Sequence, residues 1–359
     1  MEYWLRDDCN SWAAPWPSDE LQSVASCPVC RSAERQLLHD ELVDNVFFSA
    51  PGKWTLHRCT QCTSAYLDPR PSPASIGEAY RNYYTHAVGS KQADFARLTV
   101  SRRLRRMLAN GYLNHRYGTQ RRPAADWGGW VAAVLPDLRR SLDRGFRHLP
   151  KPRRGQRLLD IGCGNGDFLV NAQEAGWFVS GLEPDPEAAA VARQRGLHVT
   201  MGTVDVLANE WNSFDAITLS HVIEHVHEPN LLLQAVRRLL KPGGVAYIDT
   251  PNIDSRGAHY FGKNWRGLEP PRHLVLFNPA SLIALLSALG FEGIKIKRRT
   301  DVLQSMYQQS FSLAMAGRRP PDREPPRLPW SARIRMHLQS VESSRHLEFI
   351  TLLAHKGQV

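Results

Sequence analysis

The feature that most constrains the fold of this chain is a regular alternation of short apolar strands and helices from residue 156 onward. The predicted strands are Arg157–Gly162, Phe178–Glu183, His198–Met201, Phe214–Ser220 and Gly244–Thr250. The predicted helices between them are Asp167–Ala175, Pro186–Arg195 and Leu231–Leu240. Strands that alternate with helices indicate an α/β fold with a doubly wound parallel sheet, covered by helices on both faces.

The C-terminal part extends this sheet. A helix is predicted at Pro279–Leu289, a strand at Phe291–Arg299 and a last strand at Leu347–His355. Between the two strands lies a proline-rich insertion, residues 318–329, which we expect to form a surface loop.

A glycine-rich turn follows the first strand, with glycines at 162, 164 and 166. Side chains there would block a cofactor from the backbone. Glu183 ends the next strand, where a carboxylate can accept both ribose hydroxyls of an adenosine. A nicotinamide dinucleotide is the main alternative. The glycine spacing differs from the dinucleotide pattern G-x-G-x-x-G, and the helix stop and turn at residues 239–244 is not needed there.

Four segments together resemble the class I S-adenosylmethionine-dependent methyltransferases: LLDIGCGNGDFL, GLEPDP, FDAITLSHVIEHVHEP and LLKPGGVAYIDTPN. The resemblance covers residues 156–299 and the final strand. It implies a Rossmann-like seven-stranded sheet, S-adenosylmethionine as cofactor and methyl transfer as the reaction. The implied cofactor residues are Asp160, Gly162, Cys163, Gly164 and Gly166 around the methionine, Glu183 and Pro184 at the ribose, Thr203 and Val204 at the adenine, and Ser220 near the sulfonium.

Candidate bases for the acceptor follow the fourth strand, where open α/β sheets bind ligands. His221, Glu224, His225 and His227 crowd this edge. If the chain is helical after Ser220, His221 and His225 share one helical face. No cysteine or carboxylate array completes a closed shell there, so a metal site is not favoured. Each histidine could instead be a hydrogen-bonded capping residue.

A second acceptor patch, residues 260–274, combines aromatic rings with Arg and His, which suits a sugar ring or a phosphate-linked acceptor. It also resembles a stretch found in a bacterial subfamily of these methyltransferases, and it could equally serve as a lid. As general base we prefer His225, then His221, then His273. Glu224 is expected to orient an imidazole, since a solvated carboxylate is a poor base at neutral pH.

Two cysteine pairs, Cys27-x-x-Cys30 and Cys59-x-x-Cys62, stand 28 residues apart. Without a secretory signal at the N-terminus, this spacing predicts a closed, structural zinc site, with disulfides as the alternative. The module resembles the N-terminal zinc ribbon of the same subfamily. It departs from that pattern at Thr63, where glycine is common.

We expect four regions: an N-terminal arm (1–20), a zinc-binding module (21–75), a basic helical connector (76–154) and the methyltransferase domain (155–359). Residues 97–157 hold sixteen Arg and Lys against three Asp, a local charge of +13 in a chain of net +10. Such an excess suits an anionic partner or a solvated helical face.

The leading functional hypothesis is O-methylation of a small molecule such as a sugar, a surface-polysaccharide precursor or a secondary metabolite, with an anionic or sugar-nucleotide acceptor possible. The alternative is a ribosomal-RNA or other nucleic-acid methyltransferase with a zinc ribbon, which the basic connector favours. Against it, the fourth strand ends in Ser-His-Val-Ile-Glu-His and not in Asn/Asp-Pro-Pro-aromatic. A cytoplasmic protein without a transmembrane segment is expected. The sequence leaves the oligomeric state open.

Overall fold

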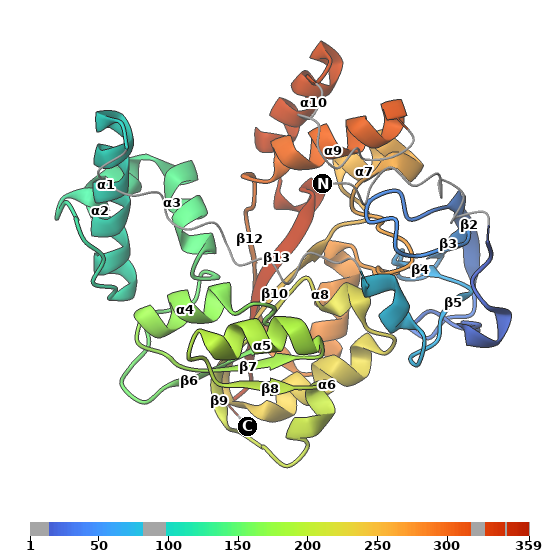
Figure 1. Cartoon of the computed structure of the whole chain (residues 1–359), viewed down its shortest axis with the longest axis horizontal. Helices are drawn as coiled ribbons and strands as arrows, with labels where there is room; N and C mark the ends of the chain where they lie inside the picture. The colour runs from blue at the N-terminus through green and yellow to red at the C-terminus, as the bar shows by residue number, and fades with distance from the viewer. Residues whose placement is uncertain (1–13, 82–97, 317–326, 342, 359) are drawn as a thin grey trace.

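The computed structural model describes residues 14–81, 98–316, 327–341 and 343–358 (Figure 1). At its centre is one seven-stranded sheet in the order β12-β13-β10-β9-β6-β7-β8. Only β13 in this sheet runs antiparallel to its neighbours. The strands are β6 (Arg157–Ile161), β7 (Phe178–Glu183), β8 (Val199–Met201), β9 (Phe214–Ser220), β10 (Leu240–Pro251), β12 (Phe291–Lys297) and β13 (Phe349–Lys356). The seven predicted strands and the class I methyltransferase fold are confirmed.

Alternate residues of the central strands enter two separate cores. Leu158 and Tyr247 pack under α4 (Asp167–Glu174), α5 (Pro186–Gln194) and α1 (Val100–Tyr117). Their neighbours Leu159 and Ile248 pack on the opposite face under α6 (Pro229–Leu239) and α8 (Pro279–Ala288). The period of two in each strand therefore covers both faces of the sheet with helices.

The basic connector forms α1, α2 (Gly128–Val134) and α3 (Pro136–Arg144), which lie at the left edge of Figure 1. Tyr112 and Tyr117 donate hydrogen bonds to Asp143 at 2.6 and 2.7 Å, which ties α1 to α3. A Cβ at Gly111 would lie 1.8 Å from the carbonyl oxygen of Ala125, so the tight packing of α1 requires glycine there.

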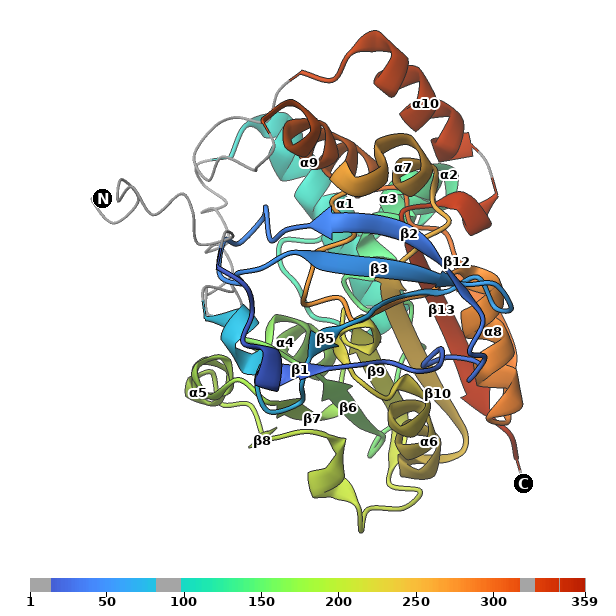
Figure 2. The same ribbon diagram turned by 90° about the vertical axis from the view of Figure 1, so that its right-hand side faces the viewer.

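The N-terminal module consists of β1 (Leu21–Gln22), β2 (Arg35–Leu42), β3 (Trp54–Cys59), β4 (Ala65–Leu67) and β5 (Arg70–Pro71). Strand β11 (Val275–Leu276), from the C-terminal half, pairs with β4 and completes a four-stranded sheet in the order β11-β4-β3-β2. Figure 2 shows β2 and β3 side by side, with α7 (Arg256–Phe261) and α9 (Leu303–Ala316) above them. The module is therefore built into the fold rather than attached by a linker.

Two expectations need correction. Trp16 is 5% exposed and packs edge-on against Trp54 at 5.5 Å between ring centroids, so residues 14–20 are not a loose arm. Residues 1–13 lie outside the described residues. Sequence analysis also missed α7, α9 and α10 (Trp330–Val341). Of these, α9 and α10 flank the proline-rich insertion, and residues 317–326 are not described.

No helix in the described part of the chain has the length and apolar character needed to cross a membrane.

Candidate active site and zinc centre

The glycine turn after β6 brings the backbone close to its neighbours at two positions and leaves it open at a third. Gly162, Gly164 and Gly166 all have positive φ angles, of 68°, 53° and 81°. A Cβ at Gly162 would lie 2.6 Å from Val222 Cγ2, and one at Gly166 would lie 2.3 Å from Leu197 Cδ1. A Cβ at Gly164 would meet nothing within 4 Å. Two glycines thus permit packing, while Gly164 borders open space that a ligand can approach.

Glu183 ends β7 beside this turn and is 6% exposed. Its Oε2 accepts a hydrogen bond from the Gly164 N–H at 2.7 Å, and its Oε1 accepts one from the Asp185 N–H at 3.0 Å. Burial raises the pKa of Glu183, and these two backbone hydrogen bonds oppose that rise. Each carboxylate oxygen keeps a lone pair for a further donor, which suits the two hydroxyls of a ribose.

Arg147, which sequence analysis did not identify, pairs with Asp160 at the end of β6. Its guanidinium lies 3.7 Å from the centroid of the Phe168 ring. Asp160 Oδ1 also accepts a hydrogen bond from Thr218 at 2.8 Å. The other oxygen, Oδ2, is buried and has no hydrogen-bond partner among the described residues. An acceptor and a guanidinium side by side fit the ammonium and carboxylate of an amino acid, so these residues fit the methionine end of S-adenosylmethionine.

The remaining predicted cofactor residues lie at the same edge of the sheet. Cys163 is buried in the turn, and Pro184 is exposed after β7. Thr203 and Val204 follow β8, where a short 3-10 helix begins, and Ser220 is the last residue of β9. All of them follow the carboxyl ends of β6 to β9, although their contact with a cofactor stays a prediction.

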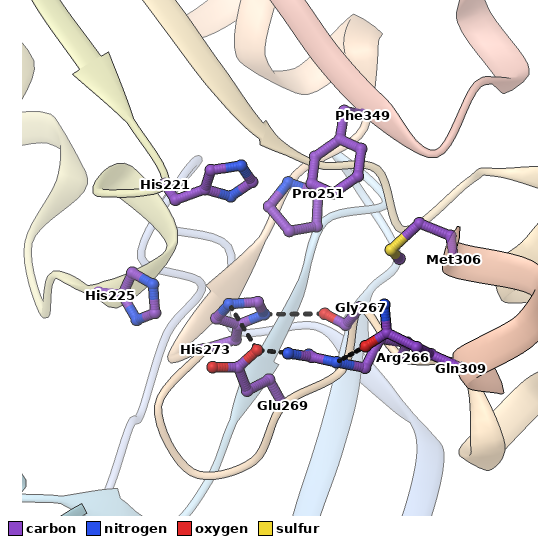
Figure 3. Close-up of a pocket in the computed structure, with 10 residues that line it drawn as sticks. All are labelled: His221, His225, Pro251, Arg266, Gly267, Glu269, His273, Met306, Gln309 and Phe349. Atoms are coloured by element: carbon purple, nitrogen blue, oxygen red, sulfur yellow. Dashed lines mark hydrogen bonds and ion pairs between the residues drawn. The ribbon is translucent and has the colours of Figure 1, made fainter. Parts of the chain in front are cut away.

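A cavity of about 390 Å³ adjoins this edge (Figure 3). It receives side chains from the ends of β9 and β10, from residues 266–273, from α9 and from β13. Of the four predicted acceptor-site histidines, His221, His225 and His273 line it. The lining residues are His221, His225, Pro251, Arg266, Gly267, Glu269, His273, Met306, Gln309 and Phe349.

The backbone bends at His221, whose side chain lines this cavity. Its φ is 57°, in the left-handed region, and only Ile223–His225 form a short 3-10 helix, so the expected helical face shared by His221 and His225 is wrong. The imidazole lies between two carboxylates: Nδ1 is 3.3 Å from Glu224 Oε1 and Nε2 is 3.5 Å from Asp249 Oδ2.

Glu224 is fully buried, which corrects the expectation of a solvated carboxylate. It accepts a hydrogen bond from Thr250 Oγ1 at 2.9 Å. Burial raises its pKa, but the hydrogen bond with His221 and the nearby imidazoles outweigh burial and hold the pKa at about 2. Glu224 is therefore ionised at neutral pH.

His225 and His273 lie on the other side of the cavity, with ring centroids 4.7 Å apart. His225 Nδ1 is 3.0 Å from the Arg272 carbonyl oxygen and 2.8 Å from the Tyr80 hydroxyl. His273 Nδ1 is 2.8 Å from the Gly267 carbonyl oxygen. Burial lowers the pKa of His273 to about 4, which keeps it neutral. His227, by contrast, bonds to the Pro71 carbonyl at 2.9 Å and does not line this cavity.

Arg272 anchors residues 266–273 to the N-terminal module. Its side chain is fully buried and makes a bidentate pair with Asp44, with N···O distances of 2.9 and 2.6 Å. It also contacts Glu269 at 3.3 Å, and Glu269 in turn pairs with Arg266. Burial raises the pKa of Glu269, but Arg266, His273 and Arg272 outweigh it and hold that pKa well below its usual range.

The four predicted zinc ligands come together in the N-terminal module. Cys27 and Cys62 Sγ lie 3.6 Å apart, Cys30 and Cys59 Sγ lie 3.5 Å apart, and all four sulfurs lie within 4.8 Å of one another. No disulfide joins them. With Zn–S bonds of about 2.3 Å, a tetrahedral ion needs sulfurs slightly less than 4 Å apart, so the cluster fits Zn²⁺.

The two cysteine knuckles have matching backbones. Arg31 and Thr63, each four residues after the first cysteine of its pair, have φ angles of 66° and 60° and donate N–H bonds back to Cys27 and Cys59. Thr63 therefore adopts the conformation that glycine would favour. Its hydroxyl oxygen accepts a hydrogen bond from Asn278, the N-cap of α8, at 2.7 Å, which fixes the knuckle to the C-terminal half.

Residues 134–296 match a family described as a methyltransferase domain. Among curated proteins, the chain is 36% identical over 105 residues to a ubiquinone biosynthesis O-methyltransferase of Xanthomonas oryzae pv. oryzae, covering 27% of this chain and 44% of that protein. The protein of the same description from Xylella fastidiosa is 35% identical over 108 residues, covering 28% and 44%. The chain thus spans less than half the length of the curated relatives it matches.

A solved structure described as a SAM-dependent methyltransferase from Archaeoglobus fulgidus is 21% identical, with a TM-score of 0.41, and covers 62% of this chain and 93% of that one.

Proposed function

We propose that this chain, whose residues 134–296 match a methyltransferase domain, transfers the methyl group of S-adenosylmethionine to a hydroxyl oxygen of a small molecule. One observation carries the proposal: two consecutive residues, His221 and Val222, connect the polar cavity to the cofactor turn. Val222 approaches Gly162 so closely that no side chain fits there, and its neighbour His221 lines the cavity. A donor methyl group at the turn and an acceptor in the cavity would therefore meet.

On the cofactor side, Glu183 would hold the ribose hydroxyls, and Asp160 with Arg147 would hold the ammonium and carboxylate of the methionine. The open side of Gly164 and the unpartnered Asp160 Oδ2 support these roles. The bound cofactor supplies the electrophilic methyl group, and the protein's part is to align it with the acceptor.

On the acceptor side, we propose His221 as the general base in preference to His225. His221 is next to the residue that packs on the cofactor turn, and its side chain is 38% exposed toward the cavity. Glu224 is a positioning residue, since its buried carboxylate can accept a hydrogen bond from Nδ1 and leave Nε2 to receive the proton. His225 and His273 contact backbone carbonyls through Nδ1, whereas Nδ1 of His221 faces a carboxylate, which stabilises the ring when it takes up a proton.

The character of the cavity supports a small hydroxylated acceptor. A volume of about 390 Å³ suits a sugar or a substituted aromatic ring. Glu269 pairs with Arg266, so this wall offers hydrogen-bonding groups with little net charge. The O-methyltransferase description of the curated relatives supports oxygen as the methylated atom. A sugar, a surface-polysaccharide precursor or a secondary metabolite all belong to this class.

We further propose a structural Zn²⁺ in the four-cysteine site and, because free thiolates persist in a reducing compartment, a cytoplasmic location. The experiment that tests the function is transfer of labelled methyl from S-adenosylmethionine into two pools, one of hydroxylated small molecules and one of RNA. We expect label in the first pool, with a shallow dependence on salt. Label confined to RNA, with binding that weakens steeply as salt rises, would assign the basic connector to phosphate contacts and overturn the proposal.

A further inference from the structure

We propose that Glu224, His225 and His273 form a binding site for a divalent transition-metal ion inside the acceptor cavity, separate from the four-cysteine site. One ligand atom from each residue lies within 4.8 Å of the other two. His225 and His273 line the cavity, as Figure 3 shows, and Glu224 lies buried next to His225 in the chain. Two imidazoles and one carboxylate are the donor set of mononuclear sites that keep open positions for substrate.

The tautomers of both histidines support this assignment. A backbone carbonyl can only accept a hydrogen bond, so the contact of His273 Nδ1 with the Gly267 carbonyl places the proton on Nδ1. His225 Nδ1 lies 3.0 Å from the Arg272 carbonyl and 2.8 Å from the Tyr80 hydroxyl, whose oxygen can accept from the same N–H when Nδ1 donates to the carbonyl. Each Nε2 then carries a free lone pair. Metal-binding histidines typically donate their second N–H to a carbonyl or carboxylate in this way, which fixes the ring.

The charge of the cavity points the same way. Glu269 is balanced by Arg266 and Arg272. For Glu224, which is fully buried, the ion pairs among the described residues include no Arg or Lys, and its recorded side-chain contacts are with Thr250 and His221. A buried carboxylate needs a compensating charge, and a divalent ion between it and two imidazoles would supply one.

The donor set also selects the kind of ion. Mg²⁺ and Ca²⁺ prefer all-oxygen ligands, whereas two imidazole nitrogens suit Mn²⁺, Fe²⁺, Co²⁺ or Zn²⁺. Three protein ligands leave coordination positions open toward the cavity.

The catalytic use of the site rests on the function proposed above. An ion held by these residues would make an acceptor hydroxyl more acidic. His221 would take the hydroxyl proton, while the oxygen forms its bond to the methyl carbon and the electrons of the broken carbon–sulfur bond return to sulfur.

Titration of the full, zinc-loaded chain with Mn²⁺, followed by electron paramagnetic resonance and calorimetry, tests the site, because Mn²⁺ competes poorly for four thiolates. We expect one Mn²⁺ per chain. His273→Asn, His225→Asn and Glu224→Gln should each weaken Mn²⁺ binding at least tenfold, since each removes one ligand. In the two Asn variants, the side-chain amide can still donate to the backbone carbonyl that the histidine Nδ1 contacts, so each keeps that local hydrogen bond.

His259→Ala, which removes an exposed histidine outside the cavity, is the matched control and should bind Mn²⁺ as the wild type does. Circular dichroism identifies any variant that fails to fold, and the Mn²⁺ affinities of the folded variants then test the metal site. Wild-type protein that binds no Mn²⁺, or ligand variants that all bind it like the control, would overturn the metal site. S-Adenosylmethionine affinity, measured on the same samples, separately reports whether the proposed function has failed.

Discussion

The two halves of the candidate active site are built in contrasting ways. Apart from Arg147, the residues assigned to the cofactor, from Asp160 to Ser220, fall within one continuous stretch of strands, helices and turns. The acceptor cavity draws on five segments between His221 and Phe349, and a sixth segment around Asp44 holds one of them in place. A local site can be recognised from motifs, whereas a site assembled from distant segments becomes visible only when the chain is folded.

The N-terminal module supports the acceptor side specifically. Asp44 binds Arg272, and β4 pairs with β11, which begins two residues after His273. Tyr80, shortly after the module, contacts His225. By contrast, Arg147 of the connector supports the cofactor side through Asp160. Substitutions on the acceptor side should therefore lower turnover with little effect on S-adenosylmethionine affinity, and substitutions on the cofactor side should do the reverse. Four predictions concern this separation.

The largest effect is expected from loss of the zinc ion. We expect about one zinc per chain, absent after Cys27→Ser with Cys30→Ser, and a markedly lower melting temperature, because binding of a structural metal is linked to folding. Turnover should fall far more than S-adenosylmethionine affinity. Elemental analysis and calorimetry measure the two quantities. Purified wild-type protein without zinc would remove the module assignment, and equal losses on both sides would remove the proposed separation.

The next effect concerns His221 alone. His221→Ala should lower turnover about 100- to 10,000-fold and leave S-adenosylmethionine affinity unchanged, as expected for removal of a positioned base. The control is His227→Ala, outside the cavity. Turnover is measured with labelled cofactor and the best acceptor from the small-molecule pool. If His221→Ala retains near-full turnover, His221 is not the base. If His225→Ala and His273→Ala also retain it, the acceptor is a carbon, a nitrogen or an already ionised oxygen.

A third effect concerns the anchor of the acceptor segment. Arg272→Ala leaves Asp44 buried without its partner, and breaking such a buried pair costs about 3–5 kcal/mol of stability. Lys53→Ala, which breaks the exposed pair with Glu41, should cost about 0–1 kcal/mol. Denaturant unfolding compares the two variants. Equal midpoints would mean that the Arg272–Asp44 pair does not hold the two segments together.

Sequence patterns placed the predicted cofactor residues at one edge of the sheet and brought the four cysteines together, because both predictions depend on spacing along the chain. Cofactor contact of those residues stays a prediction. All seven strands were predicted because their alternation reflects burial on two faces; the largest difference is at β10, which begins at Leu240 and not at Gly244. Arg147 could not be identified among sixteen basic residues, because only its contact with Asp160 distinguishes it. Met306 and Gln309 were missed because α9 is mixed in composition and carries no clear helical stripe.

The acceptor residues show a further limit of sequence analysis. His221, His225 and His273 were recognised as a group, but their separate roles depend on tautomers and partners that the sequence does not contain. Glu224 was expected to be solvated, because its neighbours in the sequence do not show which segments cover it. Its burial follows from packing between β10 and residues 272–274: it accepts a bond from Thr250, and its carbonyl accepts the N–H of Leu274 at 2.8 Å.

The smallest predicted effect is on the cofactor side. Glu183→Ala should weaken S-adenosylmethionine binding by about 1.5–3 kcal/mol, the range for a hydrogen bond to a charged group. Glu183→Gln should lose less, because the amide oxygen can still accept from the Gly164 or Asp185 N–H. At saturating cofactor both variants should keep most of their turnover, since Glu183 does not line the acceptor cavity. Calorimetric titration measures the affinities. Unchanged affinity in Glu183→Ala would remove Glu183 from the ribose role, while a loss of turnover at saturating cofactor would show that the two halves of the site are coupled after all.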